Sequence, residues 1–534
     1  MAERLMGIET EYAVSALYPG IFAAYEPDQV VHALLELARR KLVHLPDIGG
    51  GMFMANGARF YLDYGNHPEL TTPECANPWD VVRYVLAGER IISGLAHDLA
   101  AELGVEVMVF KSNVDYGSRW VTWGCHESYM HRASPYALSE QIIPHLVTRI
   151  IYTGAGGFNT QSDGLDFTLS PRVPHLSNVL SNNSTSDRGI FHTKDESLTR
   201  PGFHRLHVIC GESLCSETSM WLKVATTSLV VAMIEAGLRP GKGVGLRSPL
   251  QAMQTIASDS SCSALVDTVE GARLSALEIQ YHYLSQAEKH LGDSGMPPWA
   301  HEVCIKWREI LNCLLEGPEA VAVRLDWGIK RELYANYANS QGVTWDSLPH
   351  WNRVIAEVRN LLDQPDDRHR PFSLDSIMKI DDAAAMARLT EFLNWKGLSW
   401  DAIESVLRLR QQLFEIDTRF GQLGGGVFQM LDQAGVLKHH VVGVDSIEDS
   451  MSNPPATGRA RVRGNAIRRL SGAEGKYQCD WQGILDVDTK RLLDLSEPFE
   501  TSERWLEYEQ AVSIGLPAFI PMLTRFDESM PRRF

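Results

Sequence analysis

Apolar residues along this chain recur at the two spacings that distinguish helices from strands. They recur every three or four residues over positions 27–43 and again over 79–103, which predicts two amphipathic helices. A strand candidate follows each helix, at 59–63 and at 105–115. The helical spacing returns in five later segments, at 139–152, 216–236, 278–291, 351–362 and 400–420.

The later part of the chain contains features that suggest a division into domains. The helix predicted at 216–236 is apolar on nearly every side, so we expect it to be buried. A polar stretch at 363–371 reads as a linker, and three glycines stand in succession at 424–426. A chain of 534 residues is too long for one ordinary core. We expect a large domain over 1–425 and a small C-terminal domain with an extended tail over 426–534.

The segment Gly7-Ile-Glu-Thr-Glu-Tyr12 reads as a strand that carries two acids on one face. Side chains alternate along a strand, so Glu9 and Glu11 point the same way. Two like charges side by side are unfavourable unless a cation or a shared proton lies between them. The pair therefore indicates a metal site, and the alternative is a solvated face of an antiparallel sheet.

The same alternation of polar and apolar positions recurs in three other predicted strands. If all four form one antiparallel sheet, its apolar face packs on helices and its polar face becomes a cradle for divalent ions that hold a polyphosphate. The fragments His67-Pro-Glu69 and Gly124-Cys-His-Glu127 fit this cradle and favour Mg²⁺ or Mn²⁺ over a thiolate zinc site. The alternative is a polar face that simply meets solvent. The polar positions of the three strands are Arg59, Tyr61 and Asp63; Lys111, Asn113 and Asp115; and Arg205 and His207.

Composition and charge narrow the class of protein. The chain has 44% hydrophobic and 22% charged residues, and its net charge of −17 argues against nonspecific binding to nucleic acid or anionic lipid. Its first residues lack the features of a signal peptide, and no long apolar stretch occurs. The eight cysteines are scattered and read as reduced thiols. We expect a cytoplasmic protein that binds neither nucleic acid nor membrane.

Motifs for several other chemistries are absent from the sequence. There is no Gly-x-x-x-x-Gly-Lys-[Ser/Thr] phosphate loop and no Gly-x-Ser-x-Gly nucleophile elbow. The segment His126-Glu-Ser-Tyr-Met-His131 misses the spacing of a zinc protease by one residue. The acid-bearing strands are therefore the main candidate for chemistry.

Nine motifs, spread in order over most of the chain, carry a resemblance to a known family. They are Gly7-Ile-Glu-Thr-Glu-Tyr12, Asn56-Gly-Ala-Arg-Phe-Tyr-Leu-Asp63, His67-Pro-Glu69, Gly124-Cys-His-Glu127, Arg205-Leu-His-Val208, Ser216-Glu-Thr218, Pro454-Pro-Ala-Thr-Gly-Arg459, Arg463-Gly464 and Asp480-Trp481. These motifs resemble the family of the Pup ligase (proteasome accessory factor A) and the Pup deamidase-depupylase. The resemblance implies an α+β, glutamine-synthetase-like fold, in which a curved antiparallel sheet forms a cradle packed on helices beside a small C-terminal domain.

The resemblance also implies a site for ATP and two or more Mg²⁺ ions. Asp63 matches the catalytic aspartate of the family, and Arg205 is a candidate phosphate contact. Trp481 is a candidate neighbour of the adenine or, alternatively, a buried core residue. The two implied sets of Mg²⁺ ligands are Glu9, Tyr61 and Glu69, and Glu11, His126 and His207.

The ligase branch of that family phosphorylates the side-chain carboxylate of a C-terminal glutamate on a Pup-like modifier, and a lysine of a target protein then attacks the acyl phosphate. The resemblance implies these two partners and a monomeric enzyme. Asp63 would act as the base, since the lysine amine must lose a proton to attack. The depupylase branch resembles the chain less, because its long insertion before the Asn56 strand is absent.

Three alternatives to this ligase function stay open. They are hydrolysis of such a bond or of a C-terminal glutamine, ligation of a different peptide or small amine, and binding without turnover. The family's usual Asn-Thr-Arg-Asp-Glu-Pro is here His192-Thr-Lys-Asp-Glu-Ser197, and the tail from about 504 to 534 extends beyond the family pattern. These differences lie on the substrate side of the expected site.

Overall fold

The computed structural model describes residues 4–20, 26–182, 187–192, 202–362, 383–473 and 475–499, together with the short strand Thr524–Arg525. The predicted linker at 363–371, the segment 193–197 of the altered motif and the tail at 504–534, apart from that strand, lie outside the described residues. Within the described ranges, no helix is long and apolar enough to cross a membrane.

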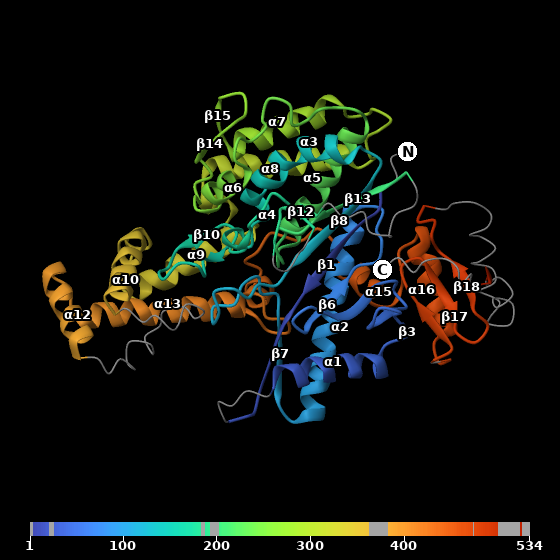
Figure 1. Cartoon of the computed structure of the whole chain (residues 1–534), viewed down its shortest axis with the longest axis horizontal. Helices are drawn as coiled ribbons and strands as arrows, with labels where there is room; N and C mark the ends of the chain where they lie inside the picture. The colour runs from blue at the N-terminus through green and yellow to red at the C-terminus, as the bar shows by residue number, and fades with distance from the viewer. Residues whose placement is uncertain are drawn as a thin grey trace.

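A sheet of nine strands forms the centre of the protein (Figure 1). Every neighbouring pair is antiparallel except β11 and β12, so the predicted antiparallel cradle is confirmed for most of its width. In spatial order the strands are β11 (Leu180–Ser181), β12 (Phe191–His192), β13 (His204–Val208), β8 (Cys125–His131), β1 (Met6–Glu11), β6 (His67–Thr71), β5 (Arg59–Asp63), β4 (Met52–Met54) and β3 (His44–Pro46).

Helices cover the apolar face of this sheet and form the main core with it. Ile8 and Leu206 of the strands lie in one hydrophobic cluster with Val81 and Leu222 of the covering helices. The helix predicted at 216–236 is buried along nearly its whole length, as its all-round apolar sequence predicted. The helices that lie against the strands of the sheet are α1 (Pro27–Lys41), α2 (Pro78–Leu103) and α5 (Glu217–Glu235). A second group packs on α5, namely α3 (Pro135–Thr148), α4 (Ile150–Thr153), α7 (Ala276–Lys289) and α8 (Ala300–Glu316), and α6 (Pro249–Ala257) packs on α3.

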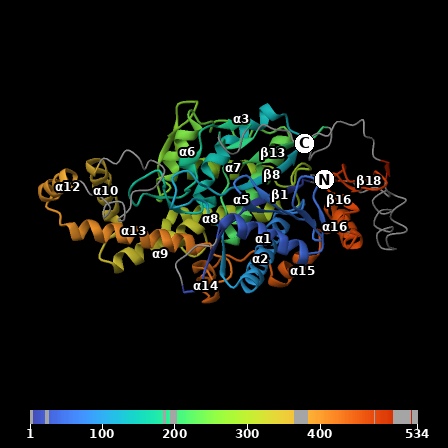
Figure 2. The same cartoon turned by 60° about the horizontal axis from the view of Figure 1, so that its bottom comes forward.

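A helical arm extends from the nine-stranded sheet on one side, and a C-terminal unit lies on the opposite side, as both views show (Figures 1 and 2). The arm has a hydrophobic core of its own, to which Tyr334, Ile355, Leu389 and Leu413 belong. Its helices are α9 (Asp326–Ser340), α10 (Leu348–Leu362), α12 (Ala383–Lys396) and α13 (Trp400–Phe420).

The C-terminal unit combines α16 (Gly458–Leu470) with a four-stranded sheet and packs on β3 and β4. Before it, α14 (Val427–Gln433) and α15 (Val444–Ser452) pack on α13 and α2 respectively. The domain boundary near residue 425 stays a prediction. The four strands are β16 (Tyr477–Cys479), β17 (Gly483–Asp486), β18 (Arg491–Asp494) and β19 (Thr524–Arg525).

The strand predicted at 105–115 does not join the cradle, which corrects one sequence-based expectation. It ends early, as β7 (Glu106–Phe110), and pairs with β2 (Ala13–Leu17) in a separate two-stranded sheet. Beyond it the side chain of Lys111 turns to Glu89 and to the carbonyl of Leu214, and Asn113 donates to Ser213. Lys111, Asn113 and Asp115 are thus not part of the cradle surface.

The sheet and its covering helices are tied together by a buried ion pair. Arg149 donates through Nη1 and Nη2 to the two carboxylate oxygens of Glu127 on β8, at 2.8 and 2.6 Å, and both side chains are at most 2% exposed. Although burial acts in the opposite direction, Arg149 lowers the pKa of Glu127.

Replacing Arg149 with methionine is expected to lower the free energy of unfolding by about 3–5 kcal/mol, because it leaves a buried carboxylate without its counter-charge. Urea unfolding of the purified protein measures this loss. Arg239→Met is the matched control, since its ion pair with Glu140 is exposed and should contribute less than about 1 kcal/mol. Equal losses in the two variants would contradict the structural role of the buried pair.

Candidate active site

The polar face of the sheet brings Glu9 together with two imidazoles and a guanidinium. Glu9 lies opposite His126 in the pairing of β1 with β8. Its Oε2 is 3.5 Å from His126 Nδ1 and 3.5 Å from His207 Nε2, and its Oε1 accepts a hydrogen bond of 2.8 Å from Arg205. Both histidines are buried. A carboxylate, two imidazoles and a guanidinium thus meet at the middle of the cradle.

A second group forms around Glu11, one step further along the same face. The carboxylate oxygens of Glu11, Asp63 and Glu69 lie within 4.8 Å of one another. Glu11 Oε2 lies 3.0 Å from His67 Nδ1 and accepts the backbone N–H of Gly124 at 2.8 Å. Three acids so close together, two of them buried, form the most acidic part of the cradle.

The pairing of acids with imidazoles differs from the one that the resemblance implied. Glu9, not Glu11, lies between His126 and His207. Tyr61 donates a hydrogen bond to Glu69, its partner in the implied set of Glu9, Tyr61 and Glu69. Glu69, however, lies in the acidic cluster with Glu11. Strand register is the physical reason: Glu11 lies opposite Glu69 on β6, whereas the imidazoles lie on the other side of β1. The assignment of individual metal ligands stays a prediction.

Charge and burial set the protonation of these acids. Although burial acts to raise it, His207 and Arg205 hold the pKa of Glu9 well below its usual range. Burial and the other carboxylates around it raise the pKa of Glu69 well above its usual range. Burial and its acidic neighbours also raise the pKa of Asp63. The negative charge of the carboxylates around Glu69 is therefore not balanced by the positive groups beside them.

The donor set fits divalent cations. Oxygen donors from three clustered acids suit Mg²⁺ or Mn²⁺, and the imidazoles beside Glu9 extend the set toward Mn²⁺. The raised pKa of Glu69 also indicates a cation site, because a cation beside this carboxylate would stabilise its ionised form.

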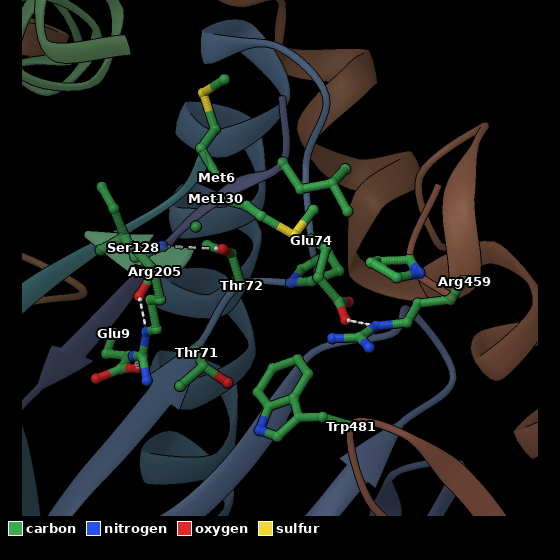
Figure 3. A pocket seen from close by; sticks show the side chains of 15 residues that line it. Met6, Glu9, Thr71, Thr72, Glu74, Ser128, Met130, Arg205, Arg459 and Trp481 are labelled. Atoms are coloured by element: carbon green, nitrogen blue, oxygen red, sulfur yellow. Dashed lines mark hydrogen bonds and ion pairs between the residues drawn. The ribbon is translucent and has the colours of Figure 1, made fainter. Parts of the chain in front are cut away.

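A pocket opens at one end of the cradle, between the nine-stranded sheet and the C-terminal unit (Figure 3). Glu9 and Arg205 line it on the sheet side, and Trp481 faces it from the C-terminal unit. Trp481 is half-buried; its ring meets Phe53 edge-on at 4.9 Å, and the guanidinium of Arg463 lies 4.9 Å from its centroid. Trp481 therefore both lines the pocket and packs at the edge of the core.

A second pocket opens at the opposite end of the acidic cluster. It contains Asp63, Glu11 and His126, together with Arg172 and Arg188. The exposed side chains of Tyr64 and Trp120 also line it. Asp63 thus lies at the end of the cradle away from Trp481, between the metal-binding candidates and an open pocket.

An ion-pair cluster beside the first pocket joins the sheet to the C-terminal unit. Glu74 accepts from Arg459 Nε at 2.5 Å (Figure 3). It also pairs with Arg463. Although burial opposes them, Arg463 and Arg459 lower the pKa of Glu74 to about 2.

Replacing Glu74 with glutamine is expected to destabilise the protein by on the order of 3 kcal/mol at neutral pH. A carboxylate with a depressed pKa contributes stability above its unfolded value of 4.5, and this contribution is lost as pH falls through about 2. The variant should therefore show a flatter dependence of unfolding free energy on pH between 4.5 and 2. Urea unfolding measures this dependence. If the unfolding free energy of the variant changed with pH as steeply as that of the wild type in that window, the stabilising role given to Glu74 would be contradicted.

Several residues at the site were given no role by the sequence. His67 belongs to a motif that was identified, but its contact with Glu11 depends on the pairing of β6 with β1. Arg172 and Arg188 lie outside every motif, and only the folded chain places them beside Asp63.

Comparison of the whole structure with solved structures defines the class of protein. The chain matches the crystal structure of the Pup ligase PafA in complex with the prokaryotic ubiquitin-like protein Pup, with a TM-score of 0.71 and 25% identity, over 96% of this chain and 92% of that one. The structure of PafA in complex with ADP gives a TM-score of 0.66 at 23% identity and covers 93% of this chain and 97% of that one. The fold and the acid-and-imidazole cradle define an enzyme of the glutamine-synthetase-like ligases.

Sequence comparison then identifies the family. The model of the Pup-ligase protein family matches residues 4–356 and 347–485. A Pup–protein ligase from Rhodococcus erythropolis is 30% identical over 517 residues, which are 95% of this chain and 99% of the relative. Another, from Mycobacterium ulcerans, is 30% identical over 509 residues, 93% of this chain and 97% of the relative. The chain belongs to the Pup-ligase family.

Proposed function

We propose that this enzyme uses ATP and Mg²⁺ to join the side-chain carboxylate of a C-terminal glutamate, on a Pup-like modifier, to lysine amines of target proteins. The observation that carries the proposal is the order of groups along one face of the sheet. Trp481 and Arg205 lie at one end. The acidic cluster begins with Glu11 and Glu69, and its third acid, Asp63, lies at the other end. The names and near-complete coverage of the relatives support the same reaction.

The first pocket is the proposed nucleotide site. Trp481 offers an aromatic face to the adenine, and Arg205 offers a guanidinium to the phosphates at the point where the pocket meets Glu9. Because Arg205 Nε also donates to Ser128 Oγ at 3.0 Å, its head group is held in position before a substrate binds. ADP in the related PafA structure supports a nucleotide in this fold.

The proposed ligands of two or more Mg²⁺ ions are three acids, one phenol and two imidazoles of the cradle: Glu9, Glu11, Glu69, Tyr61, His126 and His207. When bound, Mg²⁺ supplies positive charge that stabilises the phosphoryl group during transfer. The protein's own contribution is to hold these donors on adjacent strands of a buried sheet, where their positions are fixed by the backbone ladder.

Asp63 is the proposed base for the incoming amine. A lysine amine is protonated at neutral pH, so it attacks only after losing a proton. Burial raises the pKa of Asp63, which makes this carboxylate a stronger base than an ordinary aspartate. Its position in the open second pocket gives a protein side chain a route to it.

The hydrolytic alternative uses the same residues but a different acceptor, water. The short connection between the first helix and the Asn56 strand and the ligase names of the relatives favour ligation. Ligation of a different peptide or small amine would use the same acids and would differ from the proposed reaction only in what the two pockets bind. Binding without turnover would give the clustered acids no chemical role. We also propose that the protein is cytoplasmic and monomeric. The cytoplasmic location agrees with its eight cysteines, which are all free thiols.

Intact-mass spectrometry tests the proposal directly. The enzyme is incubated with ATP, Mg²⁺, a modifier ending in glutamate and a lysine-bearing protein, and a product whose mass is the sum of both proteins less one water is expected. Loss of a preformed conjugate, without net consumption of ATP, would instead establish the hydrolase.

A further inference from the structure

Two acids and two histidines form another cluster of side chains that can bind a metal, outside the cradle. Glu217 is the first residue of α5, Asp432 lies in α14, and His439 and His440 lie in the connection between α14 and α15. One ligand atom from each of Glu217, His439 and His440 lies within 4.8 Å of the other two. The cluster is built on α5, which covers the apolar face of the sheet, whereas the cradle is on the polar face. The proposed ligase reaction therefore gives these side chains no role.

Hydrogen bonds determine which nitrogen of each imidazole can bind a metal. Asp432 Oδ1 lies 3.0 Å from His439 Nε2 and 3.0 Å from His440 Nε2, so this one oxygen accepts an N–H from both rings. The backbone N–H of Glu217 donates to His439 Nδ1 at 3.3 Å, which requires a lone pair on that nitrogen. His440 Nδ1 lies 2.9 Å from Glu217 Oε1. With both Nε2 protons directed to Asp432, the lone pairs of both Nδ1 atoms face Glu217.

The carboxylate of Glu217 is held in position to share a cation with these nitrogens. Its Oε2 accepts the backbone N–H groups of Val441 and Val442 at 2.5 and 2.9 Å, which leaves Oε1 directed to His440. A carboxylate oxygen and an imidazole lone pair 2.9 Å apart repel unless positive charge lies between them. Two carboxylates beside two neutral imidazoles also leave negative charge that a divalent cation balances. Asp432 is placed as the outer carboxylate that orients metal-binding imidazoles in many metal sites.

We propose that Glu217, His439 and His440 bind one Zn²⁺ ion, while Asp432 accepts the N–H of both imidazoles. Two imidazoles and a carboxylate are a usual donor set for Zn²⁺, whereas Mg²⁺ prefers oxygen donors alone. The hydrogen bond from the Glu217 backbone to His439 is long, and the bond from Nδ1 to the metal takes its place. The ion joins the connection between α14 and α15 to the first turn of α5. Its role is structural and does not depend on the ligase reaction.

The experiment measures zinc bound to the full-length enzyme, which is first stripped with EDTA and then dialysed to equilibrium against Zn²⁺ alone. Mass spectrometry of the metal content is expected to find one more Zn²⁺ per chain in the wild type than in His440→Gln. The same difference should persist when both proteins also carry Glu9→Ala, which separates this site from the cradle. His439→Gln should lose the same ion. His290→Gln is the matched control, because this exposed histidine pairs only with Asp293, and it should keep the ion.

A second readout is thermal stability. Zn²⁺ at about a hundredfold above its Kd should raise the melting temperature of the wild type by about 3 °C and leave that of His440→Gln unchanged. The side chain of His440 is exposed, so its replacement leaves the core intact, and circular dichroism checks that the variant is folded.

Three results would overturn the inference. Equal zinc content in the wild type and in folded His440→Gln would show that this cluster binds no ion and holds a proton between Glu217 and His440 instead. Loss of all bound zinc in Glu9→Ala would assign the ion to the cradle. A melting temperature that Zn²⁺ raises equally in the wild type and in His440→Gln would place the stabilising ion elsewhere in the protein.

Discussion

Replacing Glu9 with alanine is expected to abolish the binding of Mg²⁺-ATP. The change removes the one carboxylate that lies between His126, His207 and Arg205. Without it the guanidinium of Arg205 loses the acid that offsets its charge and the cradle loses a cation ligand, so affinity for Mg²⁺-ATP should fall by more than about a hundredfold. Isothermal titration of the variant with ATP, with and without Mg²⁺, measures the effect.

The comparison with and without Mg²⁺ separates loss of the metal from damage to the nucleotide pocket. The variant should differ most from the wild type when Mg²⁺ is present. Glu36→Ala, on the exposed face of α1, is the matched control and should bind normally. Normal affinity of the Glu9 variant for Mg²⁺-ATP would count against the site as described.

Asp63→Asn is expected to slow ligation by about a hundredfold to ten-thousandfold, the usual effect of losing a general base. Asp63 lies in the second pocket, away from Trp481 and Arg205, so ATP affinity should change little. The defect should shrink as pH rises toward the lysine pKa of about 10.4, because a larger fraction of the amine is then already deprotonated. Rates of conjugate formation between pH 7 and 9.5 test both expectations.

Two outcomes would contradict the role given to Asp63. A full rate at pH 7 would show that another group, or no group, takes the proton. An equal fractional defect at every pH would show that Asp63 positions the substrate and does not act as the base.

The sequence predicted most helices correctly because their apolar spacing is long and strong. The helix predicted at 400–420 coincides with α13, and the one at 216–236 with the buried α5. It also predicted that acids alternate on strands facing one way, since alternation is a local property of a strand. These features depend only on neighbouring residues.

Which strands pair, and in what register, was beyond the sequence. The alternation at Lys111, Asn113 and Asp115 is as regular as that at Glu9 and Glu11, yet β7 pairs with β2 outside the cradle. Likewise the grouping of Glu9 with His126 depends on where β8 lies against β1. Contacts across strands depend on the whole sheet, so local patterns supply the candidate residues and leave their partners open.

The measurement that tests the central claim most directly is the release of ADP by the wild-type enzyme with each substrate left out in turn. Ligation requires both an activated glutamate and an amine, so ADP release should be stoichiometric with the conjugate and should need both the modifier and the lysine-bearing protein. Turnover of ATP that is indifferent to the amine would contradict the claim that this cradle joins a carboxylate to an amine.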